Sequence, residues 1–170
     1  GNVLTLTSGI VNTTATNLLT VTNTAGGTVA GGSSSSYVNG PFARALPGSG
    51  TINFPVGKSG YQQFEMLGYT TSGSLTATVE SFDVAAGGTD GFVFSSSPNP
   101  TRYWSASLSG GGSFTIVGTI RLLDAGMTIT SSNVIGNSST LTGTYNSIGG
   151  ININSPAAGN IASSATVPSP

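Results

Sequence analysis

The chain has 170 residues and a formal net charge of −1 at pH 7, and 36% of its residues are hydrophobic, which is enough for a buried core. It contains no His and no Cys, so a Ser-His triad, a thiol nucleophile, a His- or Cys-ligated metal and a disulfide are excluded. Four basic residues are too few for an electrostatic footprint on nucleic acid, and no apolar run approaches the roughly 18 residues of a membrane span.

Small polar residues dominate the composition, with 26 Gly, 26 Ser and 24 Thr, whereas charged residues make up only 5%. Low charge gives little repulsion between copies and favours association. Surfaces of Thr, Ser, Gly and Asn with almost no Lys or Glu are typical of extracellular bacterial wall, matrix or filament proteins. We therefore expect an extracellular, cell-surface location, and the start at Gly1 rather than Met suits a processed segment.

Residues 1–57 contain short strands in which apolar residues alternate with Thr. Small polar turns separate the strands, and their spacing suits either the rungs of a solenoid-like segment or an extra antiparallel sheet layer. The same segment could instead supply a donor strand to another copy. The expected strands are Val3–Thr7, Leu18–Thr22, Tyr37–Arg44 and Thr51–Val56.

Residues 58–154 are expected to form a β-sandwich of jelly-roll-like type, because strands recur at roughly 8–12-residue spacing. The fold class is therefore all-β, and residues 155–170 form a Ser/Ala/Pro tail or linker. Aromatic clustering predicts a sandwich core of Phe82, Phe92, Phe94, Trp104, Phe114 and Ile116. The expected strands are Gln63–Tyr69, Ser74–Val84, Gly91–Phe94, Arg102–Leu108, Ser113–Leu123, Met127–Thr130, Thr140–Tyr145 and Gly150–Asn154.

Three stretches carry a family resemblance: Tyr37-Val38-Asn39-Gly40-Pro41-Phe42-Ala43-Arg44, then Phe54-Pro55-Val56-Gly57-Lys58, then Arg102-Tyr103-Trp104-Ser105. Their order resembles modules of large secreted surface proteins and adhesins of Bacteroidota-type bacteria, many of which are exported through the type IX pathway. The resemblance spans residues 1–125. It implies a Gly/Thr-rich solenoid-like segment before a β-sandwich, used as a spacer, stalk or adhesive unit.

The carboxylates offer the first alternatives to a structural role. Five acids could supply a glycosidase pair, although they are scattered, and we predict no catalytic residue. Asp83 and Asp90 around Gly87-Gly88 could hold calcium, against the plain interpretation of Asp as a turn residue. We predict no cofactor and no required transition metal, because the usual soft ligands are missing.

Lys58, the only lysine, could form an isopeptide bond with Asn53 assisted by Glu65 or Glu80, against the plain interpretation of a solvated lysine. Tyr61, Tyr103 and Trp104 could stack on sugar rings, although a single Trp in an apolar strand more often belongs to a core. A glycan or surface ligand therefore stays an alternative partner.

We expect a non-enzymatic extracellular structural protein: a repeating subunit of a surface filament or matrix, or a module of a long adhesin. Copies of the chain would associate by β-strand pairing, with no nucleic acid partner. The alternative is a carbohydrate- or surface-binding β-sandwich module. The terminal segments Asn2–Thr7 and Ile151–Asn154 alternate and could be exchanged between copies. The interface residues expected from this are Val3, Leu4, Leu6, Ile151 and Ile153.

Overall fold

The computed structural model describes residues 3–25, 27–91 and 98–166, apart from the side chains at 115–117. This part of the chain contains sixteen β-strands and no helix, so the expected all-β class is confirmed. Few helix formers and many β-branched residues account for it. In chain order the strands are β1 (Leu4–Leu6), β2 (Val11–Asn12), β3 (Leu19–Val21), β4 (Val29–Gly31), β5 (Val38–Asn39), β6 (Phe42–Ala45), β7 (Ser49–Phe54), β8 (Val56–Gly57), β9 (Phe64–Ser72), β10 (Leu75–Phe82), β11 (Thr89–Asp90), β12 (Tyr103–Gly110), β13 (Ser113–Leu123), β14 (Gly136–Asn137), β15 (Thr144–Ser147) and β16 (Asn160–Ala162).

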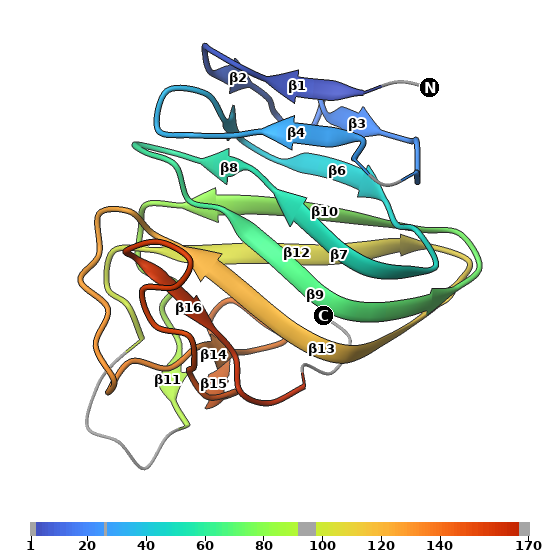
Figure 1. Ribbon diagram of the computed structural model, residues 1–170. Coiled ribbons are helices and arrows are strands. Elements are labelled where there is room, and N and C mark those ends of the chain that lie inside the picture. The colour runs from blue at the N-terminus through green and yellow to red at the C-terminus, as the bar shows by residue number, and fades with distance from the viewer. Residues whose placement is uncertain (1–2, 26, 92–97, 167–170) are drawn as a thin grey trace.

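The N-terminal strands form two stacked turns of chain, drawn in blue in Figure 1. The first coil (β1, β2 and β3) lies on the second coil (β4, β5 and β6), and each strand of one pairs in parallel with the corresponding strand of the other. Parallel pairing between successive turns of chain is the arrangement of a solenoid, so this segment is solenoid-like. The pairs at the strand starts are Leu4 with Val29, Val11 with Val38, and Leu19 with Phe42.

Glycines at two corners let the coils approach this closely. Gly40 has a φ of 129°, and a Cβ there would collide with the backbone carbonyl of Thr13 in the first coil. Gly31 has a φ of 81°, and a Cβ there would collide with the carbonyl of Leu6. Only glycine combines a positive φ with the absence of a Cβ, so both corners depend on it.

The second coil leads into a β-sandwich of two four-stranded sheets. The first sheet has the strand order β12-β10-β6-β3, so β3 and β6 belong both to the coils and to the sandwich. The second sheet has the order β16-β13-β9-β7, and Figure 1 shows it in front of the first. Strand β8 extends the stack of β2 and β5, with Val56 paired to Val38. A smaller sheet, β11-β15-β14, lies at the bottom of Figure 1, at the end of the molecule opposite the first coil.

One hydrophobic core runs through the whole molecule, from Leu6 in the first coil to Ile161 in β16. Its centre is aromatic: Phe54 packs edge-on against both Phe42 and Phe64, with ring centroids 6.1 Å apart in each pair. The N-terminal coils and the sandwich therefore share a core instead of forming separate cores.

The predicted aromatic core is only partly correct. Trp104 and Phe114 are half-buried and pack against the core. Phe82 instead lies on the outer face of β10, stacked on Tyr103 with ring centroids 4.7 Å apart. Along β10 the buried positions are Leu75 and every second residue after it, which puts Phe82 on the other side. Phe92, Phe94 and the side chain of Ile116 lie outside the described residues.

Two alternating stretches are not strands. Met127–Thr130 follows the turn at Asp124, whose carbonyl accepts a hydrogen bond from Met127 N–H (3.0 Å). Gly150–Asn154 contains a single β-bridge at Ile151 and then turns, because Asn152 and Asn154 adopt φ values of 51° and 56°. Alternation predicts an extended backbone, which these left-handed residues interrupt. Most of the expected strand Gly91–Phe94 lies outside the described residues.

The prediction that residues 155–170 form a tail or linker is also wrong for its central part. Residues 160–162 form β16, which pairs antiparallel with β13 at the edge of the second sheet. Ile161 and Ala162 are buried there, and the following Ser163 is fully buried. The strand has only three residues, which is too short for an alternating pattern to reveal it in the sequence.

Candidate functional site

Three strand edges lie together at one end of the molecule. β1, β2 and β3 are each the terminal strand of a different sheet, so each has a neighbouring strand on one side only. Because these strands make up the first coil, the edges that no described strand occupies face away from the second coil, at the top of Figure 1. We call this surface the open end. An unpaired edge presents backbone N–H and C=O groups that another strand can bind.

The hydrogen bonds to the second coil show which backbone groups of β1 are free to face outward. Leu4 N–H donates to Thr28 O (2.9 Å), and Leu6 O accepts from Gly32 N–H (3.3 Å). In a parallel ladder, successive residues direct their N–H and C=O groups to opposite sides of the strand. Thr5, between these two residues, therefore points both groups at the open end.

Strand β2 has the same arrangement. Val11 N–H donates to Tyr37 O and Thr13 N–H to Asn39 O, both at 3.0 Å. Asn12 lies between the two donors, so its backbone N–H and C=O point at the open end.

The side to which the backbone N–H and C=O groups of β3 point follows from the hydrogen bonding of its neighbour β6. Leu46, just beyond β6, donates its N–H to Leu75 O (2.9 Å), so every second residue before it also faces β10. The backbone N–H and C=O groups of Ala43 point the other way, toward β3. There they bond to the residues on either side of Thr20. Thr20 consequently points its backbone groups at the open end, as Thr5 and Asn12 do.

The hydrophobic core is also uncovered at this end. Val11 is 36% exposed, whereas Val38, its partner in the second coil, is completely buried. Three further apolar side chains of the first coil and its corners are exposed: Val3 by 58%, Ile10 by 46% and Leu18 by 39%. Exposed apolar side chains next to unpaired strand edges are the surface features that β-strand association requires.

No charged residue lies in positions 1–43. The first one, Arg44, is buried beneath the first coil, where its Nη1 donates to Asn53 O (2.5 Å) and Asn53 Oδ1 (3.0 Å). Its Nη2 donates to Thr28 Oγ1 (3.0 Å). Burial lowers the pKa of Arg44 to about 10, against a smaller opposing effect of Tyr69. Arg44 stays protonated near neutral pH, but it is not part of the open-end surface.

Three of the five expected interface residues lie at or next to the open end. Leu4 and Leu6 form β1 and pair within their own chain with β4, and Leu6 is buried. Val3 precedes β1 and is exposed. Thr5, Asn12 and Thr20 were missed, because side-chain alternation does not show which backbone groups a neighbouring strand occupies.

The other two expected interface residues are at the far end of the chain. Ile151 is 42% exposed and exchanges two hydrogen bonds with Ala162, at 2.7 and 2.9 Å. Ile153 is half-buried and packs against the core. This segment turns instead of extending, so the structure offers no free strand there.

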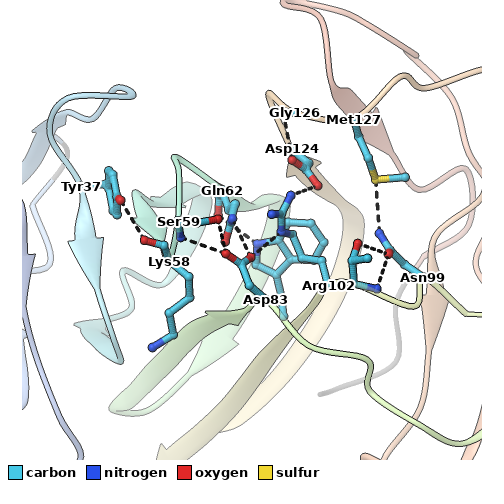
Figure 2. Close-up of polar contacts among 12 residues, drawn as sticks. Tyr37, Lys58, Ser59, Gln62, Asp83, Asn99, Arg102, Asp124, Gly126 and Met127 are labelled. Atoms are coloured by element: carbon cyan, nitrogen blue, oxygen red, sulfur yellow. Dashed lines mark hydrogen bonds and ion pairs between the residues drawn. The ribbon is translucent and has the colours of Figure 1, made fainter.

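Four of the five acidic residues form ion pairs that connect different parts of the chain. Arg102 lies between Asp83 and Asp124 and pairs with both carboxylates, as Figure 2 shows. Its Nε is 2.8 Å from Asp83 Oδ1. Elsewhere Glu65 pairs with Arg121 (2.7 Å) and Glu80 with Lys58 (2.8 Å).

Asp83 is the most heavily bonded carboxylate. Its oxygens accept hydrogen bonds from Ser59 N–H (2.9 Å) and hydroxyl, from Gln62 Nε2 (2.9 Å) and from Arg102. Burial raises the pKa of Asp83, but the bonds from Ser59 and Arg102 outweigh that effect and lower it to about 2. Both oxygens are thus already occupied by donors, which disfavours the alternative of a calcium site at Asp83. Within the described residues, no group of three or more acidic side chains that could hold a metal ion occurs.

Lys58 pairs with Glu80, one of the acids that could assist an isopeptide bond, but the side chain of Asn53 is engaged by Arg44. Its Nζ pairs with Glu80 Oε1 and lies 5.5 Å from the centroid of the Phe82 ring. Asn53, the expected partner, instead accepts from Arg44. The side chain of Lys58 is 30% exposed, so it is a half-exposed ion-pair partner.

The aromatic residues that the sequence offers as alternatives for sugar stacking are engaged in other contacts. Trp104 Nε1 donates to Gln62 O (2.9 Å), and Tyr103 stacks on Phe82. Tyr61 hydroxyl donates to Gln63 Oε1 (2.9 Å). Trp104 also lines a cavity of about 540 Å³ between β12, β13 and the C-terminal part of the chain. Its other lining residues include Met127, Ile129, Asn99 and Asn133.

Comparisons of the chain with protein-family models, with curated proteins and with solved structures found no match. Among the described residues there is no helix long and apolar enough to cross a membrane. The resemblance to secreted surface modules stays a prediction that rests on the quoted motifs.

Proposed function

We propose that this chain is an extracellular structural protein that works by β-strand pairing between copies. It would serve as a repeating subunit of a surface filament or matrix, or as a module of a long adhesin. The observation that carries this proposal is the open end, where three strand edges and an uncovered part of the core lie side by side.

The absence of blocking residues at the open end supports the proposal. Natural sheet edges are usually protected by charged side chains, by proline or by bulges. The strands β1, β2 and β3 contain neither a charged residue nor proline, and positions 1–43 are uncharged throughout. A net charge of −1 leaves little long-range repulsion between copies.

The engagement of the acidic residues supports a non-enzymatic role. Glu65, Glu80, Asp83 and Asp124 each form an ion pair with Arg or Lys. A general acid or base must be within reach of a substrate and able to exchange its proton. Ion pairs that join β9 to β13 and β10 to the chain before and after it are better explained as structural contacts.

The second candidate is a carbohydrate- or surface-binding module. The observation that favours it is the cavity beside Trp104, which combines apolar walls with Asn99 and Asn133. Retention of a monomeric sample on a glycan array would favour this candidate, and association without glycan retention would favour the structural role.

A charge placed on the edge tests the structural proposal. Thr5→Lys puts an ammonium group beside the outward backbone of β1 at the open end. Ser107→Lys adds the same charge at an exposed position on β12, the edge strand opposite β3 in the sheet β12-β10-β6-β3. We expect the unsubstituted chain and Ser107→Lys to associate in sedimentation velocity, and Thr5→Lys to stay monomeric. Equal association of the two variants would contradict a role of the open end.

A further inference from the structure

Two strands of the open end are near copies of each other. β1 has the sequence Leu-Thr-Leu and β3 the sequence Leu-Thr-Val, and both have three residues with the same order of burial: partly buried, exposed, buried. They flank β2 in the first coil, on different faces. The central residues Thr5 and Thr20 both direct their backbone N–H and C=O groups away from the second coil.

This likeness allows β1 of one copy to pair with β3 of another. In an antiparallel ladder, two opposite residues exchange two hydrogen bonds when the N–H and C=O groups of each point toward the other. Thr5 opposite Thr20 of a second copy meets that condition. Leu4 then faces Val21 and Leu6 faces Leu19, so apolar side chains meet on the core side and threonines meet on the outer side.

The same arrangement satisfies β2. Gly9 N–H donates to Ser35 O (3.0 Å) and Val11 is bonded to the second coil as well, so Ile10 points its backbone groups outward, as Asn12 does. A two-fold axis through Val11 brings Ile10 of each copy opposite Asn12 of the other. The exposed Val11 side chains then cover each other.

The other ends of the same three sheets do not match the open end. They terminate at β4, β8 and β12, which come from different passes of the chain. In a head-to-tail contact, the first coil of one copy would therefore not meet three strand edges that lie side by side on the next copy. Self-pairing of the first coil needs no such match, and it brings together two surfaces without charge.

We propose that the open end binds a second copy of this chain head to head, with β1 of each copy antiparallel to β3 of the other about a two-fold axis through β2. This inference rests on the proposed function, because it takes strand pairing between copies as its basis. The contact is isologous and closed, so association through this surface stops at two copies. Any longer assembly would need a second, different junction.

Cysteine pairs test the orientation, since the natural chain contains no cysteine. Thr5→Cys and Thr20→Cys are prepared separately, and each is first checked by sedimentation for the doubled mass under reducing conditions. The two variants are then mixed, left to exchange and oxidised. A Cα separation of about 5.5 Å in a hydrogen-bonded antiparallel pair suits a disulfide.

We expect a covalent dimer from the mixture and none from either variant alone. Self-cross-linking of Thr5→Cys or of Thr20→Cys would place the axis on β1 or β3 and overturn the proposed orientation. A doubled mass without any cross-link would also overturn it, while leaving copy-to-copy association intact. A monomeric mass for the unsubstituted chain would contradict the proposed function itself.

Discussion

Val11 and Val38 are partners in one parallel ladder, yet 36% of Val11 is exposed and Val38 is completely buried. The first coil covers Val38, whereas nothing in the described chain covers Val11. A buried valine side chain contributes about 1.5–3 kcal/mol relative to an exposed one. Covering the exposed part of Val11 would contribute a fraction of that free energy, which favours the proposed second copy at the open end.

The two valines predict different effects of the same substitution. Val38→Ala removes buried methyl groups and should lower the free energy of unfolding by about 2 kcal/mol at every protein concentration. Val11→Ala should leave the dilute monomer nearly unchanged and weaken association instead. Urea denaturation of dilute samples and sedimentation of concentrated ones measure the two effects. Equal destabilisation of the dilute monomer by both would show that Val11 is already covered.

Tyr69 predicts a loss of stability at alkaline pH. Burial raises its pKa to about 12, with Arg44 opposing the change, and its hydroxyl has no hydrogen-bond partner among the described residues. An unfolded tyrosine loses its proton near pH 10, so this contribution to stability is complete below pH 10 and is lost between about pH 10 and 12. Tyr69→Phe should reduce that loss and should not lower stability at pH 7, because it removes an unpaired polar atom.

Tyr61 serves as the matched control for Tyr69. Burial, with a smaller effect of Glu65, raises its pKa to about 12 as well, but its hydroxyl donates to Gln63. Tyr61→Phe should therefore cost about 1 kcal/mol at pH 7, the net value of an ordinary hydrogen bond. Equal costs for the two variants at pH 7 would mean that Tyr69 has a partner after all.

Asp83 predicts a loss of stability in acid. Despite the opposing effect of burial, hydrogen bonds from Ser59 and Arg102 lower its pKa from 3.8 to about 2. Its contribution is complete above the unfolded value and is lost as the pH falls from about 4 to 2. Urea denaturation across this range should give a shallower pH dependence for Asp83→Asn than for the unsubstituted chain. Identical slopes would mean that Asp83 titrates alike in the folded and unfolded states.

Arg102 joins Asp83 and Asp124, so its removal leaves two carboxylates without their common partner. Arg102→Met should lower the free energy of unfolding by about 2–4 kcal/mol. Arg102→Lys should recover only part of this loss, because one ammonium group cannot reproduce the planar set of donors. Full recovery by lysine in thermal denaturation would show that charge alone matters and that the bridging geometry does not.

The alternation of apolar and polar residues is sufficient to predict the long central strands, but it is not sufficient to predict the structure at the ends of the chain. The alternation of Leu75–Val79 and the run Ser113–Leu123 predicted β10 and β13, and the structure has both. Every second residue from Leu75 onward is buried, so Phe82 lies on the outer face of β10. The prediction that its ring belongs to the core relied on hydrophobicity alone and was wrong. Two left-handed asparagines end the alternation after Ile151, and such backbone angles leave no mark on a hydropathy pattern.

The open end could be predicted only in part. The alternation of Leu4–Thr7 and Leu18–Thr22 predicted short strands with apolar residues on one side. Their parallel partners, and with them the outward direction of the backbone at Thr5, Asn12 and Thr20, depend on register between distant segments. Register is set by the packing of whole coils, and no local pattern specifies it.

Amide hydrogen exchange at Thr5, Asn12 and Thr20 reports whether the open end is paired with a second copy. These three amides point at the open end, so they are free to exchange in the monomer and hydrogen-bonded in the proposed pair. We expect their exchange to slow as the protein concentration rises through the association range. The amide of Val38, bonded to Pro55 O (2.9 Å), should stay protected throughout. Fast exchange of all three amides at concentrations where the mass has doubled would contradict the proposed pairing.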